Sequence, residues 1–488
     1  INLGSRCGIE AADVRNLYPR EGELPFDSDR KMMSTLHRID GENRMIVKGA
    51  VDRLLELTER IWTKDGVREI TEADKEKIQM QNQDFSMEGL RVLAFTYREI
   101  PENHILTMED EKHLVFLGLI AMMDPPREES KAAVAECIKA GIRPVMITGD
   151  HKITAAAIAK RIGILHDLSE ACEGADIENM SDEQLREFVP NISVYARVSP
   201  EHKIRIVRAW QEKGMIVAMT GDGVNDAPAL KNADIGIAMG KGGTDVAKNA
   251  ADMILLDDNF VTIVEAVKQG RNIYDNIKKA IHFLISTNIG EIVTIFFGLV
   301  LGIKSPLLAI QLLWINLVTD SLPAIALGLE KEEENIMSRL PRNPKKNLFA
   351  DGLWWKIIIE GAMLGMFTLL AFSIGNRLYS VEVGRTMAFL TLGILELVHS
   401  FNIKSEESIF KIGIFENKYL IGALVLGVIL QVIVVVVSPL AQVFSLVPLT
   451  GIQWLYTVLI AVAPIPIVEI QKAVNGYKFG RVVYAKNN

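Results

Sequence analysis

Long apolar runs set the second half of the chain apart from the first. Before about residue 275, charged side chains recur every few positions, as they do in soluble domains. The apolar runs that follow cover residues 280–302, 307–329, 353–375, 386–403, 419–440 and 452–470. A helix needs about 20 apolar residues to cross a membrane, and one buried soluble core does not account for so many runs in succession. The pattern therefore predicts a membrane domain at 271–488 with six transmembrane helices.

Basic residues are distributed unevenly between the loops that join these runs. The loops and tail on one side carry Lys331, Arg339, Arg342, Lys345, Lys346, Lys404, Lys411, Lys418, Lys472, Lys478, Arg481 and Lys486. The loops on the opposite side carry Lys304, Arg377 and Arg385. Cytoplasmic loops hold the excess of Lys and Arg. We therefore expect a multi-pass integral membrane protein whose soluble part faces the cytosol.

The soluble half contains two segments of one design. Arg143–Ile147 and Met215–Met219 are short apolar runs typical of buried parallel strands, and each ends at Thr-Gly-Asp. Helical patterns flank them at Glu128–Ala140, Lys152–Ile162 and Glu201–Lys213. Strands that alternate with helices predict a doubly wound parallel sheet, whose ligands bind beyond the carboxyl ends of the strands. Both Thr-Gly-Asp turns are expected at that edge.

The composition narrows the class of protein. A chain of 488 residues exceeds the ~250–300 residues that one core supports, so about three folding units are expected at ~150 residues each. Hydrophobic residues at 49%, charged residues at 23% and a mean hydropathy of +0.20 exclude a disordered chain. The net charge of −8 makes nucleic acid a poor partner. The three cysteines are too far apart for a disulfide framework or a zinc spacing.

The residues around the two turns have the chemistry of a phosphate site. Thr148 offers a hydroxyl and Lys203 an ammonium group, while Asp222 and Asp226 offer carboxylates on either side of Asn225. Hydroxyl and backbone N–H groups hold phosphate oxygens, an ammonium group offsets their charge, and carboxylates hold Mg²⁺. A single Thr-Gly-Asp more often caps a helix. Two copies with a lysine between them favour the phosphate site.

Acidic and amide side chains interrupt the apolar runs, and those within one run share a helix face, as Asn288 and Glu291 do. Each charged group at mid-bilayer costs roughly 2.5–3.5 kcal/mol, and no basic residue lies mid-span to pair with them. The candidate ligands are Asn288, Glu291, Asn316, Thr319, Asp320 and Glu396. Pro323 follows Asp320 closely and can free a backbone carbonyl near them. Contacts between helices explain a lone Asn or Thr, but not three acids. A hard cation with six to eight oxygen ligands, Ca²⁺, fits them best. His399 is a candidate proton relay, with a polar packing contact as the alternative.

One long string carries a family resemblance. Thr220–Lys231, read as TGDGVNDAPALK, resembles the hinge signature of P-type ATPases, and Asp124–Arg127 resembles another signature of that family. The resemblance covers essentially the whole chain. It implies a multidomain α/β protein with a helical membrane part: a partial nucleotide-binding domain at 1–115, a haloacid-dehalogenase-like (HAD-like) phosphorylation domain at 116–270 without its first strand, and the membrane domain.

The resemblance also implies that part of the pump is missing. The family's phosphorylated aspartate stands in an Asp-Lys-Thr-Gly-Thr string, which this sequence lacks. Residues 1–10 have no initiator Met and no signal-peptide core. We therefore expect a carboxyl-terminal part that does not turn over ATP alone and that has the missing amino-terminal part of the same pump as a partner.

The family implies roles for individual residues. In the phosphorylation domain Asp222 would hold Mg²⁺, Thr148 and Lys203 the phosphoryl group, Asn225 and Asp226 would order the loop, and Gly149 and Asp150 would face ATP. In the nucleotide-binding domain Phe26 would stack on adenine. The other nucleotide contacts would be Lys31, Lys48, Arg91 and Arg197. Taken without the family, Phe26 is better interpreted as a core residue and the basic residues as a solvated face.

The membrane motifs point to the transported ion. Ser286–Glu291 and Trp314–Asp320 resemble the calcium-binding helices of sarcoplasmic-reticulum-type calcium ATPases, and Glu396 matches a ligand on a later helix. This likeness implies ATP-driven calcium export with ATP and Mg²⁺, in a bacterial plasma membrane because the loops are short. The alternatives are a pump for Mn²⁺, Na⁺ or K⁺, a non-catalytic membrane-tethered module, and a membrane-bound phosphatase of the same sheet family.

Overall fold

The fold is described from a computed structural model of the chain. It describes every residue except 1, 28–29, 103, 123–126, 351 and 474–488. The first three residues of the predicted Asp124–Arg127 signature therefore lie outside the described residues. The chain divides into two compact units, residues 1–264 and 265–488.

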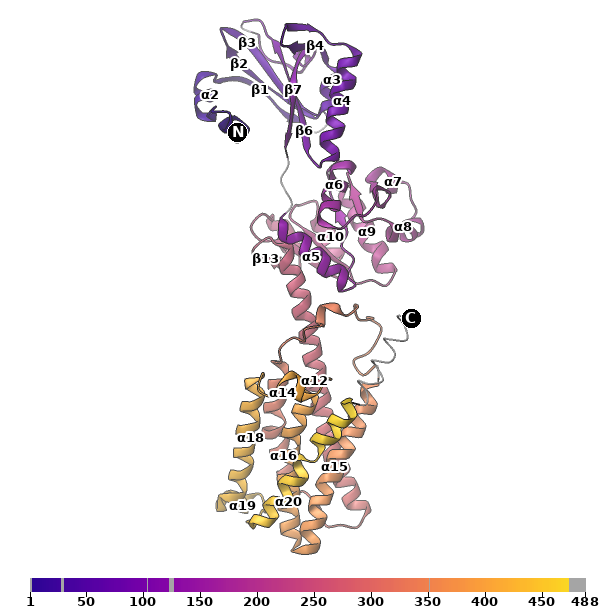
Figure 1. Cartoon of the computed structure of the whole chain (residues 1–488), viewed down its shortest axis with the longest axis vertical. Helices are drawn as coiled ribbons and strands as arrows, with labels where there is room; N and C mark the ends of the chain where they lie inside the picture. The colour runs from indigo at the N-terminus through magenta and orange to yellow at the C-terminus, as the bar shows by residue number, and fades with distance from the viewer. Residues whose placement is uncertain (1, 28–29, 103, 123–126, 351, 474–488) are drawn as a thin grey trace. The chain divides into compact units, whose positions relative to one another are not determined.

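The first unit begins with a seven-stranded, mostly antiparallel sheet in the order β1-β2-β3-β6-β7-β4-β5 (Figure 1). Its strands are β1 (Arg20–Asp27), β2 (Met32–Ile39), β3 (Glu42–Gly49), β4 (Thr58–Thr63), β5 (Gly66–Glu69), β6 (Arg91–Glu99) and β7 (Leu114–Met122). The helices in this part are α1 (Asn2–Arg6), α2 (Ala11–Leu17), α3 (Val51–Glu56), α4 (Glu72–Met87) and the 3₁₀ turn η1 (Met108–Asp110). The domain boundary predicted at residue 115 falls inside β7.

One face of this sheet is covered and the other is open. Met32 on β2, Val47 on β3 and Ala94 on β6 are buried together with Leu54 of α3. Successive residues of a strand point to opposite faces. The residues between these positions, such as Lys48, therefore lie on the face that α3 does not cover.

The rest of the first unit alternates strands with helices. Parallel strands form two three-stranded sheets, β8-β10-β9 and β11-β12-β13. The strands are β8 (Met146–Ile147), β9 (Ala171–Glu173), β10 (Val194–Ala196), β11 (Ala218–Gly221), β12 (Ile235–Met239) and β13 (Met253–Leu255). The helices are α5 (Glu128–Lys139), α6 (Lys152–Ile162), η2 (Leu168–Glu170), α7 (Gly174–Glu178), α8 (Asp182–Phe188), η3 (Val189–Asn191), α9 (Pro200–Glu212), α10 (Ala227–Asn232) and α11 (Asp245–Ala250).

Both predicted strands are shorter than their apolar runs. The first run enters the ladder only at Met146, because Arg143 instead donates hydrogen bonds to the carbonyls of Pro190 and Ile192. The second run enters at Ala218, because the N–H of Val217 donates to the Asp234 side chain at 2.8 Å. Instead of one sheet, the described strands form two.

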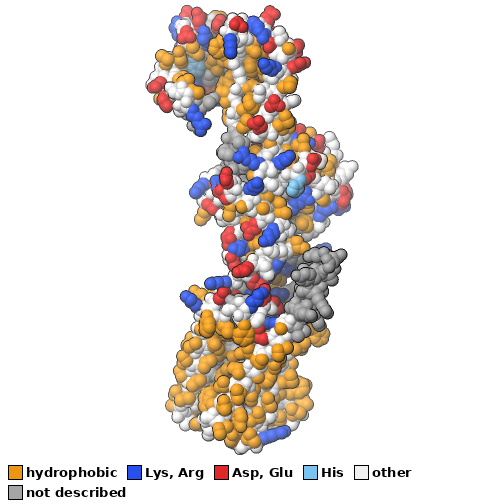
Figure 2. Space-filling model, in the orientation of Figure 1, with side chains coloured by type: hydrophobic (Ala, Val, Ile, Leu, Met, Phe, Trp, Pro, Cys, Tyr) orange, Lys and Arg blue, Asp and Glu red, His pale blue; other side chains and the backbone are white. Residues whose placement is uncertain are grey.

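The second unit is a bundle of long helices (Figure 1). Its elements are α12 (Phe260–Val300, which begins in the first unit), α13 (Ala309–Trp314), the π-helical η4 (Ile315–Thr319), α14 (Ser321–Gly328), η5 (Ile336–Ser338), α15 (Leu353–Leu378), α16 (Val381–Ile403), α17 (Ile409–Ile412), α18 (Lys418–Val436), α19 (Ser438–Val443) and α20 (Gly451–Val462). Five helical segments in the described part are long and apolar enough to cross a membrane. Figure 2 shows hydrophobic side chains over most of the visible surface of this bundle.

Small residues bring neighbouring helices of the bundle close together. A side chain at Gly375 of α15 would meet the Cα atom of Gly384 of α16 at 2.5 Å. Likewise, a side chain at Gly365 of α15 would meet Val293 of α12 at 2.6 Å. Close backbone approach is the usual basis of helix packing in membranes, where the hydrophobic effect does not drive helices together. α15 therefore packs directly on both α12 and α16.

Candidate functional site

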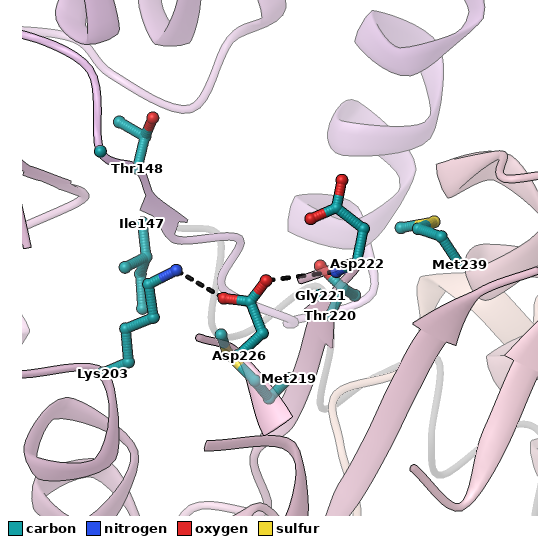
Figure 3. A pocket seen from close by; sticks show the side chains of 10 residues that line it. Ile147, Thr148, Lys203, Met219, Thr220, Gly221, Asp222, Asp226 and Met239 are labelled. Atoms are coloured by element: carbon teal, nitrogen blue, oxygen red, sulfur yellow. Dashed lines mark hydrogen bonds and ion pairs between the residues drawn. The ribbon is translucent and has the colours of Figure 1, made fainter. Parts of the chain in front are cut away.

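The two Thr-Gly-Asp turns of the first unit line one cavity of about 340 Å³ (Figure 3). The first turn follows β8, and the second lies at the end of β11, so both come from the carboxyl ends of parallel strands. The residues that line the cavity are Ile147, Thr148, Gly149, Lys203, Met219, Thr220, Gly221, Asp222, Asp226 and Met239. Five predicted residues thus border a common space: Thr148, Gly149, Lys203, Asp222 and Asp226.

Asp226 holds the second turn in shape. Its carboxylate accepts a hydrogen bond from Lys203 at 2.5 Å and from the N–H groups of Asp222 and Gly223 at 3.2 and 3.1 Å. Burial alone raises the pKa of this carboxyl, but the hydrogen bonds from Lys203 and Gly223 outweigh burial and leave the pKa below its ordinary value. Asp226 therefore stays ionised with its oxygens engaged by the protein.

Asp222, in contrast, keeps its carboxylate available. The side chain is exposed and makes no hydrogen bond or ion pair with any residue that the structure describes. Its backbone carbonyl accepts the N–H of Thr244 at 2.8 Å, which fixes the position of the residue. A free carboxylate beside hydroxyl and backbone groups is a donor set that suits Mg²⁺ shared with phosphate oxygens. Asn225 is exposed and does not line the cavity.

The first turn is closed by its own side chains. The Thr148 hydroxyl donates to Asp150 Oδ2 and accepts the N–H of Asp150, both at 3.1 Å. The N–H of Arg197 donates to the Asp150 carbonyl at 3.1 Å, and Arg197 has a φ of 49°. Arg197, predicted as a nucleotide contact, thus lies beside this turn, in the loop between β10 and α9.

The other predicted nucleotide contacts lie on neighbouring strands of the seven-stranded sheet. Lys48 of β3 is opposite Phe95 of β6, and Arg91 is four residues before Phe95, so the two basic residues share the open face. Lys31 has a φ of 56° and directly precedes β2. Phe26 near the end of β1 is 63% exposed, which rules out its interpretation as a core residue.

A second group of predicted residues meets inside the helix bundle of the second unit. Asn316 of η4 donates to Glu291 Oε1 of α12 at 2.7 Å. Thr319 of η4 lies 3.4 Å from Glu396 Oε2 of α16. Asp320, between η4 and α14, follows directly, and all three carboxylates are buried. Asp320 Oδ1 and Glu396 Oε1 have no hydrogen-bond partner among the described residues.

The π-helical turn explains how these side chains converge. In η4 the N–H of Asp320 donates to the carbonyl of Ile315 at 3.1 Å, one residue further than in an α-helix. The extra residue per turn rotates Asn316, Thr319 and Asp320 relative to α14, and π turns of this kind are common at functional sites. Pro323 alone signalled the irregularity in the sequence.

Two residues differ from the predicted ligand set. Asn288 is exposed, and its amide donates to the Leu284 carbonyl of its own helix at 2.6 Å, so no described contact joins it to the carboxylates. Its neighbour Thr287, which sequence reasoning did not single out, donates to Asp320 Oδ2 at 2.9 Å. No three His, Cys, Asp or Glu side chains in the described ranges are arranged to hold a metal ion. Any cation here would therefore need hydroxyl, amide and carbonyl oxygens as well.

Comparisons with known proteins identify the family of the chain. A family model described as "P-type ATPase, cytoplasmic domain N" matches residues 1–129, and one described as "Cation transporting ATPase, C-terminus" matches residues 304–474. The chain is 46% identical to "Calcium-transporting ATPase 1" of Bacillus cereus over 96% of this chain and 55% of the relative.

Further relatives extend the likeness beyond one genus. The "Calcium-transporting ATPase" of Bacillus subtilis is 44% identical over 95% of this chain and 53% of its own length. The "Calcium-transporting ATPase 3, endoplasmic reticulum-type" of Arabidopsis thaliana is 36% identical over 94% of this chain and 49% of its own length. The chain spans about half the length of the curated relatives it matches. It is a multipass membrane protein, and it belongs to the cation-transporting P-type ATPases.

Proposed function

We propose that this chain is the part of an ATP-driven calcium pump that carries the transport site and much of the catalytic pocket. The observation that carries the proposal is the group of buried carboxylates Glu291, Asp320 and Glu396 among membrane helices. None of the three forms an ion pair within the described part of the chain. Buried carboxylates at membrane depth require a cation or protons. The relatives named above are calcium-transporting ATPases, which favours calcium as that cation.

The ligands proposed for calcium are oxygen atoms from α12, η4 and α16. Glu291 with Asn316 and Thr319 with Glu396 are supported by their mutual contacts. Asp320 is supported by its burial directly after Thr319. Asn288 stays a proposed ligand from the sequence motif, although its side chain bonds to its own helix here. Thr287 holds Asp320 and is proposed to orient it rather than to bind the ion.

The cavity between the two turns is proposed to hold the phosphoryl group. Thr148 and the backbone at Gly149 would bind phosphate oxygens, Lys203 would offset their charge, and Asp150 would fix the turn. Asp222 would hold Mg²⁺, which when bound neutralises phosphate charge. Asp226 would keep Lys203 and the turn in place, with Asn225 in the same loop.

The nucleophilic aspartate is proposed to come from the part of the relatives that this chain does not span. Among the described strands, β8 pairs only with β10 and β11 only with β12, and both border the same cavity. An unpaired strand edge is a template for a further strand. One more parallel strand between β8 and β11 would join the two sheets into the predicted HAD-like sheet, with its end at the cavity.

ATP is proposed to bind on the open face of the seven-stranded sheet. The exposed ring of Phe26 would stack on adenine, and such base stacking is worth about 1–3 kcal/mol. Lys31, Lys48 and Arg91 would surround the nucleotide, and Arg197 beside the first turn would contact its phosphates. The three-domain division at 1–115, 116–270 and 271–488 remains a proposal.

We propose that α16 also crosses the membrane, so that the bundle has six transmembrane helices in all. α16 has 23 residues, enough to span a bilayer, although it is not one of the five segments identified above as candidate membrane spans. Its side chains are buried along most of its length, against α15, α18 and α20. A helix surrounded by other helices needs less lipid-facing apolar surface. The excess of basic residues in alternate loops supports a cytosolic location for the first unit. The membrane is proposed to be a bacterial plasma membrane.

Calcium uptake by the complete pump tests this function. In inside-out vesicles, ATP should drive calcium uptake, and Glu291→Gln and Asp320→Asn should each reduce it at least about tenfold, since each removes one charged ligand. Glu382→Gln, at the exposed start of α16, is the matched control and should leave uptake unchanged. Uptake that survives both variants, or a pump driven better by Mn²⁺, Na⁺ or K⁺ in competition, would reject calcium as the cargo.

A further inference from the structure

Three ionisable side chains meet in the helix bundle away from the proposed calcium ligands. His282 of α12, Glu360 of α15 and His399 of α16 are 3%, 2% and 0% exposed. Glu360 Oε2 lies 2.7 Å from His282 Nε2 and 3.5 Å from His399 Nε2. The two imidazole rings are 6.4 Å apart and perpendicular. One carboxylate therefore lies between imidazoles from two other helices.

This cluster is separate from the calcium ligands proposed above. His399 is three residues beyond Glu396 on α16, and its Nε2 contacts the Ser286 hydroxyl at 3.2 Å. Within the described part of the chain, no hydrogen bond or ion pair joins His282, Glu360 or His399 to a proposed calcium ligand. As noted, the described residues contain no arrangement of His and acidic groups that holds a metal ion.

Charge counting identifies the ligand. With both imidazoles neutral, Glu360 would be a buried and uncompensated carboxylate, which is strongly unfavourable. With one proton added, Glu360 and the nearer imidazole, His282, form a neutral pair. With two protons, the cluster would carry a buried positive charge. One shared proton is the state in which the buried charge is balanced.

The surrounding charges do not supply this balance. The charged groups that act on the cluster are Lys356 of α15, Glu406 in the loop after α16, and Lys472 near the end of the described chain. Lys356 donates to both oxygens of Glu406, at 3.0 and 3.1 Å. Lys472 lies 3.2 Å from Glu469. Each flanking lysine thus has a carboxylate of its own.

Unpartnered atoms are a second, independent observation. His399 Nδ1 has no hydrogen-bond partner among the described residues, and neither do the amide atoms of Asn402, three residues further along α16. Buried polar atoms are nearly always hydrogen-bonded, so such a concentration points to a functional site. His399 is also one of the two histidines beside Glu360.

We propose that His282, Glu360 and His399 form a proton-binding site that joins α12, α15 and α16. The proton resides on the pair of His282 and Glu360, while His399 stays neutral and bonds to Ser286. Since α12 and α16 carry proposed calcium ligands, loss of this proton loosens the contact between the helices that shape the transport site. The effect on transport rests on the proposed calcium pump, whereas proton binding does not.

The proton site is tested on this chain itself, reconstituted in phospholipid vesicles. Nitrogen-15 NMR of labelled histidines, assigned with His282→Gln, reports whether each imidazole is charged. We expect His282 to be charged in the native chain, because its Nε2 lies 2.7 Å from Glu360. At the same pH, His282 should be neutral in Glu360→Gln, because the carboxylate that balances its charge is gone. Glu382→Gln is the control. An identical His282 titration in the native chain and in Glu360→Gln would overturn the proposal.

A second measurement leaves Glu360 in place. In His282→Gln the shared proton must pass to Glu360, so an infrared band of a protonated carboxyl group should appear and be lost again in the double variant with Glu360→Gln. A carboxylate that stays ionised in His282→Gln would also reject the site. In the complete pump, we expect calcium uptake to fall as the pH rises, because the cluster loses its proton, and we expect this fall to be absent in Glu360→Gln. If uptake falls with pH equally in the native pump and in Glu360→Gln, the proton site is not linked to transport. If the native pump moves no calcium, the proposed function is wrong but the proton site is not affected.

Discussion

Two neighbouring aspartates of the second turn have different tasks. The Asp226 carboxylate accepts hydrogen bonds from Lys203 and from two backbone N–H groups. The Asp222 carboxylate lines the cavity and accepts no hydrogen bond from the described residues. Their positions in the sequence, four residues apart, do not distinguish them. The difference arises because the turn folds Asp226 back under the backbone of Asp222.

Asp226→Asn is expected to destabilise the second turn. The amide leaves the partly buried Lys203 without its counter-charge, and a buried group that loses its partner costs about 1–3 kcal/mol. The free energy of local opening, measured by hydrogen exchange of residues 218–230 in the full chain, should fall by that amount at pH 7. Asp234→Asn, which keeps an acceptor for the N–H of Val217, is the control and should change these amides less.

The same variant has a defined pH signature. Because the pKa of Asp226 is lowered in the folded chain, its ionised form stabilises the fold above the ordinary carboxyl pKa of about 3.9. That stabilisation is lost as the pH falls through the lowered pKa. Native and Asp226→Asn chains should therefore differ most near neutral pH and converge in acid. A difference that grows in acid would contradict the assignment.

Among helices, close backbone contacts decide which residues face one another. α15 approaches α12 and α16 through glycines, and this approach brings Glu360 between His282 and His399. The 3.6-residue period of each helix predicts which residues share a face. It does not predict how one helix is rotated against the next, which explains why Thr287 rather than Asn288 contacts Asp320.

Gly365→Ala tests the contact between α12 and α15. The new methyl group would lie 2.6 Å from Val293 and 2.8 Å from the Gly290 carbonyl, so the helices must separate. Overpacking of this kind costs about 1–3 kcal/mol, and the melting temperature of the chain in detergent should fall. Gly422→Ala on α18 is the matched control, because a methyl group there meets nothing within 4 Å. Equal melting temperatures would show that the contact is not tight.

For the chain as a whole, the decisive feature is the catalytic group that the sequence lacks. No Asp-Lys-Thr-Gly-Thr string is present, although the cavity that would receive its aspartate is lined by Thr148, Lys203 and Asp222. Each of these residues is proposed to bind phosphate, offset its charge or hold Mg²⁺, and none is proposed as the covalent acceptor. We therefore expect this chain to bind phosphate groups without accepting a phosphoryl group covalently.

The isolated chain should accordingly form no phosphoenzyme from radiolabelled ATP. Co-reconstitution with the amino-terminal half of a relative should restore calcium-dependent phosphorylation, because the added strand places its aspartate at the cavity. An amino-terminal half with that aspartate changed to asparagine is the control and should restore nothing. Phosphorylation of the isolated chain would mean that one of its own side chains is the acceptor.

The amino-acid sequence by itself determined the family, the membrane helices and most of the candidate site residues. Continuous strings such as TGDGVNDAPALK and long apolar runs are local properties, so they can be read without the fold. Only tertiary structure decided that both Thr-Gly-Asp turns border one cavity, that Thr287 replaces Asn288 beside Asp320, and that Glu360 lies between two histidines. These relations join residues far apart in the chain, and packing between elements, rather than local propensity, establishes them.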